Sequence, residues 1–74
     1  MSIVPPLPAR VVLRKLKQAG FVIVHQRGSH VKLHHPYSRR TVTIPMHPGD
    51  LGKKLIGRIL KQAGLTLEDF LRLL

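Results

Sequence analysis

Five histidines are the residues of this chain best suited to chemistry, and all of them fall between positions 25 and 47, in a stretch without a carboxylate. They are His25, His30, His34, His35 and His47. Imidazole ionises near neutral pH, so one side chain can accept or donate a proton during a reaction. Histidine surrounded by cations suits attack of an RNA 2′-hydroxyl on its neighbouring phosphate, a reaction that needs no metal ion.

A zinc site is the first alternative, because His30 and His34 have the four-residue spacing that suits one face of a helix. Residues 30–34 instead alternate as a strand does, and four residues of strand separate two side chains by about 13 Å. His34 and His35 are sequence neighbours and point to opposite faces. Neither pair can share one ion, so the sequence predicts a site without a metal or a cofactor.

Two other catalytic arrangements lack the residues that they need. A two-metal nuclease requires several convergent carboxylates, and the chain has only three acids, Asp50, Glu68 and Asp69. Ser29 precedes His30, but neighbours in an extended segment diverge, and no acid lies nearby in sequence to orient the imidazole of a nucleophilic pair. Acid–base catalysis by histidine is what remains.

His30 is the main candidate for proton transfer, because it begins a predicted strand directly after the turn residues Gly28 and Ser29. Lys32 falls on the same face of that strand, where its ammonium group can steady a phosphate. The alternative is that His30 only hydrogen-bonds to the turn or to RNA. His47, in a loop between two prolines, is either a second proton-transfer group or a hydrogen-bonding loop residue. We expect His25, His34 and His35 at the surface or facing RNA.

The charge balance favours a polyanionic partner. Thirteen Lys and Arg residues face three acids, which gives a formal net charge of +10 at pH 7. A charge of about 2–8 is enough to keep a small domain soluble. All three acids follow position 49, so the excess is strongest in the first two thirds of the chain. Nucleic-acid phosphates are the expected target, with an anionic membrane or an acidic protein as alternatives.

The 74 residues predict one domain, residues 1–74, with a Pro-rich N-terminal arm at residues 1–8. The chain has no cysteine, so its stability must come from packing. The longest uninterrupted apolar run, residues 21–24, is too short to cross a membrane. Prolines interrupt the apolar start of the chain and no basic residue precedes it, so we expect no secretory signal and a cytoplasmic location.

Hydrophobic periodicity predicts a helix over residues 9–19, with Pro8 in its first turn and Gly20 after its end. Three strands follow at residues 21–24, 30–34 and 41–44, and they can form an antiparallel meander.

A second helix is predicted to end at Ala63 before Gly64, with Asp50 as a candidate N-cap, and Thr66 caps a short last helix. Lys-Gln-Ala-Gly stands at both 17–20 and 61–64, which indicates two helices that end in the same way. The order α-β-β-β-α plus a short helix predicts an α+β fold with the helices on one face of a three-stranded antiparallel sheet.

The order and spacing of four short motifs make the chain resemble the HicA (YcfA-like) toxins over nearly its whole length. These motifs are Gly20-Phe21, Gly28-Ser29-His30 followed by His35-Pro36, Ile44-Pro45-Met46-His47, and Ile59-Leu60-Lys61-Gln62-Ala63-Gly64. The resemblance implies a fold like that of double-stranded RNA-binding domains. It also implies an mRNA-cleaving ribonuclease, or mRNA interferase, whose partner is a HicB-type antitoxin.

The resemblance implies that His30 is the family's catalytic histidine. His47 matches the family's Pro-x-His motif, and this match assigns it no catalytic role. The chain departs from the pattern in its Pro-rich arm and in a more basic start to its second helix, residues 51–54. Lys53 and Lys54 there are similar to the phosphate-contacting helix start of double-stranded RNA-binding domains. Gly28, Ser29, Lys32, Arg39, Arg40, Lys53 and Lys54 are the predicted RNA-binding residues.

Together with the residues around His30, the resemblance implies a metal-independent toxin endoribonuclease that cleaves mRNA, inhibits translation and growth, and serves in a stress response. Its Lys32, Arg39 and Arg40 would hold phosphates near His30. DNA should be bound without cleavage, because it lacks the 2′-hydroxyl nucleophile. Two rivals remain: a double-stranded RNA-binding module without catalysis, and an interaction protein whose cations only engage an acidic partner.

Overall fold

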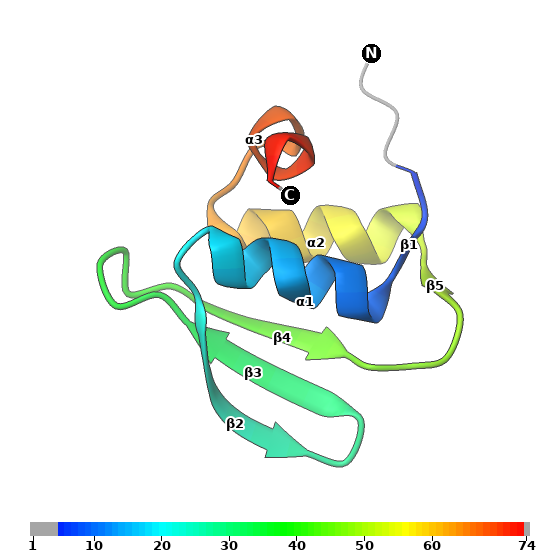
Figure 1. Cartoon of the computed structure of the whole chain (residues 1–74), viewed down its shortest axis with the longest axis horizontal. Coiled ribbons are helices and arrows are strands. Elements are labelled where there is room, and N and C mark those ends of the chain that lie inside the picture. The colour runs from blue at the N-terminus through cyan, green and yellow to red at the C-terminus, as the bar shows by residue number, and fades with distance from the viewer. Residues whose placement is uncertain (1–4, 74) are drawn as a thin grey trace.

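The chain folds into a three-stranded antiparallel sheet covered by two helices, and a third helix lies beyond them (Figure 1). This computed structural model describes residues 5–73. Its elements are β1 (Leu7–Pro8), α1 (Ala9–Gln18), β2 (Val22–Arg27), β3 (His30–His34), β4 (Thr41–Pro45), β5 (Asp50–Leu51), α2 (Lys53–Ala63) and α3 (Leu67–Arg72). The predicted α+β class and the order α-β-β-β-α are confirmed. No helix within residues 5–73 is long and apolar enough to cross a membrane.

Alternation along β3 decides which face of the sheet becomes core. Val31 and Leu33 are buried, whereas His30 and Lys32 between them are exposed. β4 shows the same alternation, and the two strands pair in antiparallel register. The predicted apolar and polar faces of β3 are therefore confirmed, and its polar face is turned to solvent.

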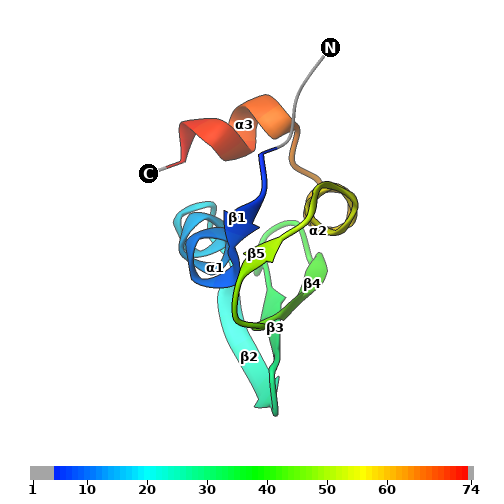
Figure 2. The same cartoon turned by 90° about the vertical axis from the view of Figure 1, so that its right-hand side faces the viewer.

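Helices α1 and α2 cover the apolar face of the sheet because each presents one apolar stripe to it. Val12 and Leu16 of α1 are fully buried. Ile56 and Ile59 of α2 expose no more than 1% of their surface. Figure 2 looks nearly along both helices and shows them next to each other, with the sheet below and α3 above. The core thus lies between the sheet and this helix pair.

Helix α3 forms a third layer on the far side of α1 and α2. Its Phe70 is fully buried, and the Thr66 hydroxyl accepts a hydrogen bond from the Asp69 backbone N–H at 3.1 Å, so the predicted cap is confirmed. The Lys15 ammonium of α1 donates to the backbone carbonyls of Phe70 (3.4 Å) and Leu73. The Phe70 carbonyl also accepts the Leu73 backbone N–H at 3.2 Å. The Lys15 cation thus joins α1 to the C-terminal end of α3, where the helix dipole favours positive charge.

The two Lys-Gln-Ala-Gly segments end α1 and α2 with the same hydrogen bonds, as predicted. The glycines at their ends have φ of +104° at Gly20 and +72° at Gly64, in the range that favours glycine. The next residue in each case donates its N–H to the carbonyl five residues earlier. These bonds are Phe21 to Leu16 at 3.0 Å and Leu65 to Leu60 at 3.1 Å.

A short ladder between the N-terminal arm and the segment before α2 was not predicted. β1 and β5 pair antiparallel, with Leu7 opposite Leu51 and Pro8 opposite Asp50. Pro8 therefore lies at the N-cap position in extended backbone, not in the first turn of α1. The predicted N-cap role of Asp50 is wrong, because the ladder holds this residue in a strand and α2 starts later, after Gly52. Residues 1–4 of the predicted arm lie outside the described residues.

Strand β2 runs to Arg27, three residues further than predicted, because the connection to β3 consists only of Gly28 and Ser29. Phe21 precedes the strand instead of beginning it, and its side chain is buried. The two strands therefore stay paired up to the turn, and His30 is the first residue after it.

Candidate functional site

His30 is the first residue of β3 and stands on the exposed face of the sheet. The two-residue turn before it depends on Gly28, whose φ of +57° is the positive value such hairpin turns require. Arg27 of β2 lies directly opposite His30 on one side, and Pro45 of β4 lies opposite on the other. Directly opposite residues share a face of the sheet, so His30 is flanked by a guanidinium and a proline ring.

A second row of the same face adds further positive charge. Lys32, two residues along β3, lies between His25 of β2 and Thr43 of β4. His30 and Lys32 therefore share a face, as predicted. Sequence reasoning missed Arg27, although the two-residue loop of a hairpin places the residues on either side of it opposite each other.

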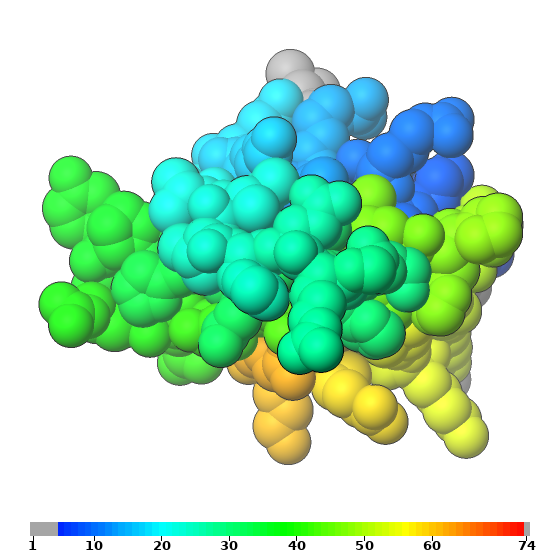
Figure 3. All heavy atoms as spheres, turned by 90° about the horizontal axis from the view of Figure 1, so that it is seen from below, coloured from blue at the N-terminus to red at the C-terminus, as the bar shows by residue number. Residues whose placement is uncertain are grey.

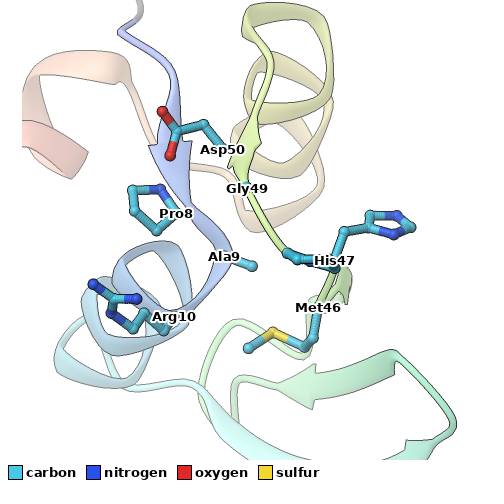
Figure 4. A pocket seen from close by; sticks show the side chains of 8 residues that line it. Pro8, Ala9, Arg10, Met46, His47, Gly49 and Asp50 are labelled. Carbon is cyan, nitrogen blue, oxygen red and sulfur yellow. The ribbon is translucent and has the colours of Figure 1, made fainter.

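The loop after β4 brings His47 to the same end of the sheet as His30. The Met46 N–H donates to the Ser29 carbonyl, which ties this loop to the turn before β3. Met46 is half-buried against the core, whereas His47 is exposed. The two side chains point in opposite directions in Figure 4, with the His47 ring directed away from the core.

A hollow of about 270 Å³ lies between this loop and the start of α1. Its lining comprises Pro8, Ala9, Arg10, Met46, His47, Pro48, Gly49 and Asp50 (Figure 4). Apolar proline and methionine surfaces lie next to one guanidinium and one carboxylate in this hollow. Arg10 is thus a second candidate that sequence reasoning missed, because only the fold places the start of α1 beside residues 46–50.

Lys53 and Lys54 begin α2 at the same end of the molecule as the β2–β3 turn (Figure 1). Both are exposed. Seen from below in Figure 3, the β2–β3 hairpin lies between loop 35–40 at one end and the segment from the end of β4 to the start of α2 at the other. The structure therefore brings Gly28, Ser29, His30, Lys32, His47, Lys53 and Lys54 to one end of the molecule, with His30 and Lys32 on the outer face of the sheet and the two lysines of α2 on the helix side.

Arg39 and Arg40 do not belong to this cluster. They lie in the loop between β3 and β4, at the opposite end of the sheet from His30 (Figure 1). The length of β3 alone separates the two sites by about 13 Å, and the Arg40 side chain lies against Gly64 at the end of α2. The expectation that these two arginines hold phosphates near His30 is corrected, because loop 35–40 joins His34 to Thr41, which pair with each other at the end of the sheet away from His30.

His35 has a structural position that differs from the predicted surface role. Its Nδ1 accepts the backbone N–H groups of Tyr37 and Ser38, so Nε2 carries the hydrogen and donates to the Ala19 carbonyl at 3.0 Å. The ring also meets Phe21 edge-on, with centroids 5.0 Å apart. His35 therefore joins loop 35–40 to the end of α1.

Gly20→Ala is expected to lower the free energy of unfolding by about 2 kcal/mol. A Cβ at Gly20 would lie 2.6 Å from Nε2 of His35. The backbone φ of +104° at this position also disfavours alanine. Gly57→Ala is the matched control, because this exposed position in α2 has open space around it. Gly57→Ala should raise the free energy of unfolding by about 0.5–1 kcal/mol. Urea unfolding of both variants is the measurement, and equal effects would contradict the assigned role of His35.

The two remaining histidines, His25 and His34, lie on neighbouring strands of the sheet. His34 lies 3.3 Å from the Thr41 hydroxyl through Nδ1, and His25 stands on β2 opposite Lys32. Within the part of the chain that the structure describes, no three His, Cys, Asp or Glu side chains gather closely enough to hold a metal ion.

Comparison with known proteins assigns the chain to a family. The family model for the HicA toxin of bacterial toxin–antitoxin systems matches residues 9–65, from the start of α1 to just past α2. The matched segment contains every residue of the cluster around His30. A search of curated proteins finds no match. The chain therefore belongs to the HicA toxin family of bacterial toxin–antitoxin systems.

Proposed function

We propose that this toxin is an endoribonuclease that cleaves mRNA in the cytoplasm without a metal ion, inhibits translation and growth, and is neutralised by a HicB-type antitoxin. The observation that carries the proposal is the position of His30, exposed at the start of β3 with Arg27 opposite and Lys32 on the same face. Membership of a toxin–antitoxin family itself implies an antitoxin partner.

In the proposed reaction, His30 takes the proton of an RNA 2′-hydroxyl, and the freed 2′-oxygen attacks the adjacent phosphorus. The bond from phosphorus to the 5′-oxygen breaks, and this oxygen leaves with a proton from a second group. His47 is the candidate donor, because the Met46–Ser29 hydrogen bond holds its loop beside the turn before His30. Water is the alternative donor. The products are a 2′,3′-cyclic phosphate and a 5′-hydroxyl.

The cations around His30 divide into two proposed groups. Arg27 and Lys32 stabilise the charge that grows on the phosphate during attack, and the backbone at Gly28 and Ser29 lets the RNA come close. Lys53 and Lys54 hold phosphates from the start of α2. Arg39 and Arg40 would bind phosphates further along the same RNA, at the other end of the sheet.

The test of the proposed function is to incubate the purified protein with a single-stranded RNA and with DNA of the same sequence, both in EDTA. We expect the RNA to be cleaved and the DNA to be bound without cleavage, because the nucleophile is the 2′-hydroxyl. Cleavage that stops in EDTA and returns with a divalent cation would contradict the metal-free reaction. Cleavage of the DNA would contradict the nucleophile.

Replacing Lys53 and Lys54 together by alanine is expected to weaken RNA binding and to lower its dependence on salt. Each lost phosphate contact should reduce the slope of log K against log salt by about 0.7–0.9. Arg72→Ala is the control, because this exposed arginine lies on α3, in the layer furthest from the sheet. Filter binding over a salt series measures both, and equal slopes for the two variants would exclude the helix start from the RNA site.

The second candidate function is binding of double-stranded RNA without cleavage. The observation that favours it is the exposed lysine pair at the start of α2, since such domains contact duplex phosphates from this helix start. Duplex binding that leaves every RNA intact would support it over the ribonuclease.

The antitoxin is proposed to cover the face that carries His30 and Lys32. Substituting both residues should then weaken antitoxin binding. Unchanged affinity would place the antitoxin elsewhere on the toxin.

A further inference from the structure

Strand β2 forms an edge of the sheet with a composition that edges of monomeric proteins normally avoid. All six of its residues are exposed. Three adjacent apolar residues, Val22, Ile23 and Val24, have exposed fractions of 50%, 40% and 53%. β4, the other outer strand, has two buried residues and packs against both α1 and α2. An open apolar edge presents unpaired backbone N–H and C=O groups and invites a further strand.

The backbone of β2 is regular where such pairing would run. The register with β3 shifts between Ile23 and His25, which leaves Val24 as the extra residue of a bulge. From His25 to Arg27 the pairing with β3 is continuous up to the turn. An added strand would therefore pair along His25–Arg27 and, continued past the bulge, would come next to Val22, Ile23 and Val24.

Charge decides which occupant fits this edge. His25 and Arg27 belong to β2, Lys32 lies on the next strand, and no carboxylate occurs before position 50. A second copy of the chain would bring two molecules of net charge +10 together. RNA has no amide backbone with which to complete a sheet. The occupant that satisfies the apolar residues, the unpaired backbone and the charge together is an acidic, extended protein segment.

We propose that β2 is a docking site for an acidic strand of a protein partner, which joins the sheet by strand addition. The proposal uses the protein partner that the toxin–antitoxin family implies, and it does not depend on ribonuclease activity. This edge is distinct from the outer face of the sheet around His30, so one antitoxin could cover the face and extend one strand along the edge.

The probe is a short capped peptide of alternating Glu and Val residues, added to the isotope-labelled full chain. NMR should show shifts and slowed amide exchange that concentrate in Val22–Arg27. The same peptide with N-methyl groups on alternate amides should bind about tenfold more weakly, since it loses hydrogen bonds to the edge. A Lys–Val peptide of the same length should not bind, because its charge repels the edge.

Two variants link the peptide to the apolar part of the edge. Val22→Thr with Val24→Thr keeps the β-branched shape and should weaken peptide binding about fivefold, because apolar burial is lost. Leu71→Gln is the matched control, since Leu71 is exposed to 47% on α3, and it should leave binding unchanged. RNA cleavage should be unchanged in both variants.

Three results would overturn the proposal. The first is peptide shifts that centre on Lys32, Lys53 and Lys54, which would indicate attraction between opposite charges alone. The second is a protein dimer in sedimentation whose β2 amides are protected without peptide, which would make a second copy the occupant. The third is no binding of the Glu–Val peptide. If RNA cleavage fails while the peptide still protects β2, only the proposed ribonuclease function is lost.

Discussion

His30→Ala is expected to lower the rate of RNA cleavage by about 10²–10⁴-fold, the usual contribution of general acid–base catalysis. Because His30 is exposed on the sheet, its removal leaves no cavity, and the thermal unfolding midpoint should stay near that of the wild type. Initial cleavage rates and RNA affinity should be measured together. A loss of rate at unchanged affinity assigns His30 to the reaction and not to binding.

His34→Ala provides the control for this prediction. His34 is also on β3 and on the same side of the strand, but at its other end, where its ring nitrogen meets the Thr41 hydroxyl. This variant should keep most of the cleavage rate. Equal losses in the two variants would show that the strand contributes general cationic contacts, and His30 would then have no special role.

Phe70→Ala is expected to lower the free energy of unfolding by about 3–5 kcal/mol, the cost of removing a buried phenyl ring and leaving a cavity. Phe70 is fully buried between α3 and the helix pair, and Lys15 stands above its ring at 5.4 Å. A core of this size rarely supplies more than about 3–5 kcal/mol in total. Most of the variant should therefore be unfolded in circular dichroism at growth temperature.

Leu71→Ala is the matched control for Phe70, because Leu71 is the next residue of α3 and is exposed to 47%. Its effect in urea unfolding should stay within about 0.5 kcal/mol. The comparison matters because α3 lies beyond residues 9–65, the segment that the family model matches. If Phe70→Ala cost no more than Leu71→Ala, α3 would not be part of the core.

The elements with a strong hydrophobic period were predictable from the sequence. Alternation around Val31 and Leu33 identified β3 and placed His30 and Lys32 on one face, as the structure confirms. The repeated Lys-Gln-Ala-Gly segments marked the ends of α1 and α2 because glycine supplies the left-handed residue there. These features depend on neighbours in sequence, so local chemistry was enough.

The features that were missed depend on contacts between distant segments. β1 and β5 have two residues each, which is too few to show a period, and they form only because the arm meets residues 50–51. His35 is held by Ala19 and Phe21, which no local pattern connects to it. The wrong grouping of Arg39 with His30 arose from closeness in sequence, whereas the direction of β3 places the two at opposite ends.

The decisive experiment for catalysis by His30 is to identify the RNA ends left after incubation in EDTA with the wild-type protein and with His30→Ala. We expect the wild type alone to produce 5′ fragments with a 2′,3′-cyclic phosphate and 3′ fragments with a 5′-hydroxyl. Fragments that end in a 3′-hydroxyl would contradict attack by the 2′-hydroxyl. Cyclic ends produced equally by His30→Ala would contradict the assignment of the reaction to His30.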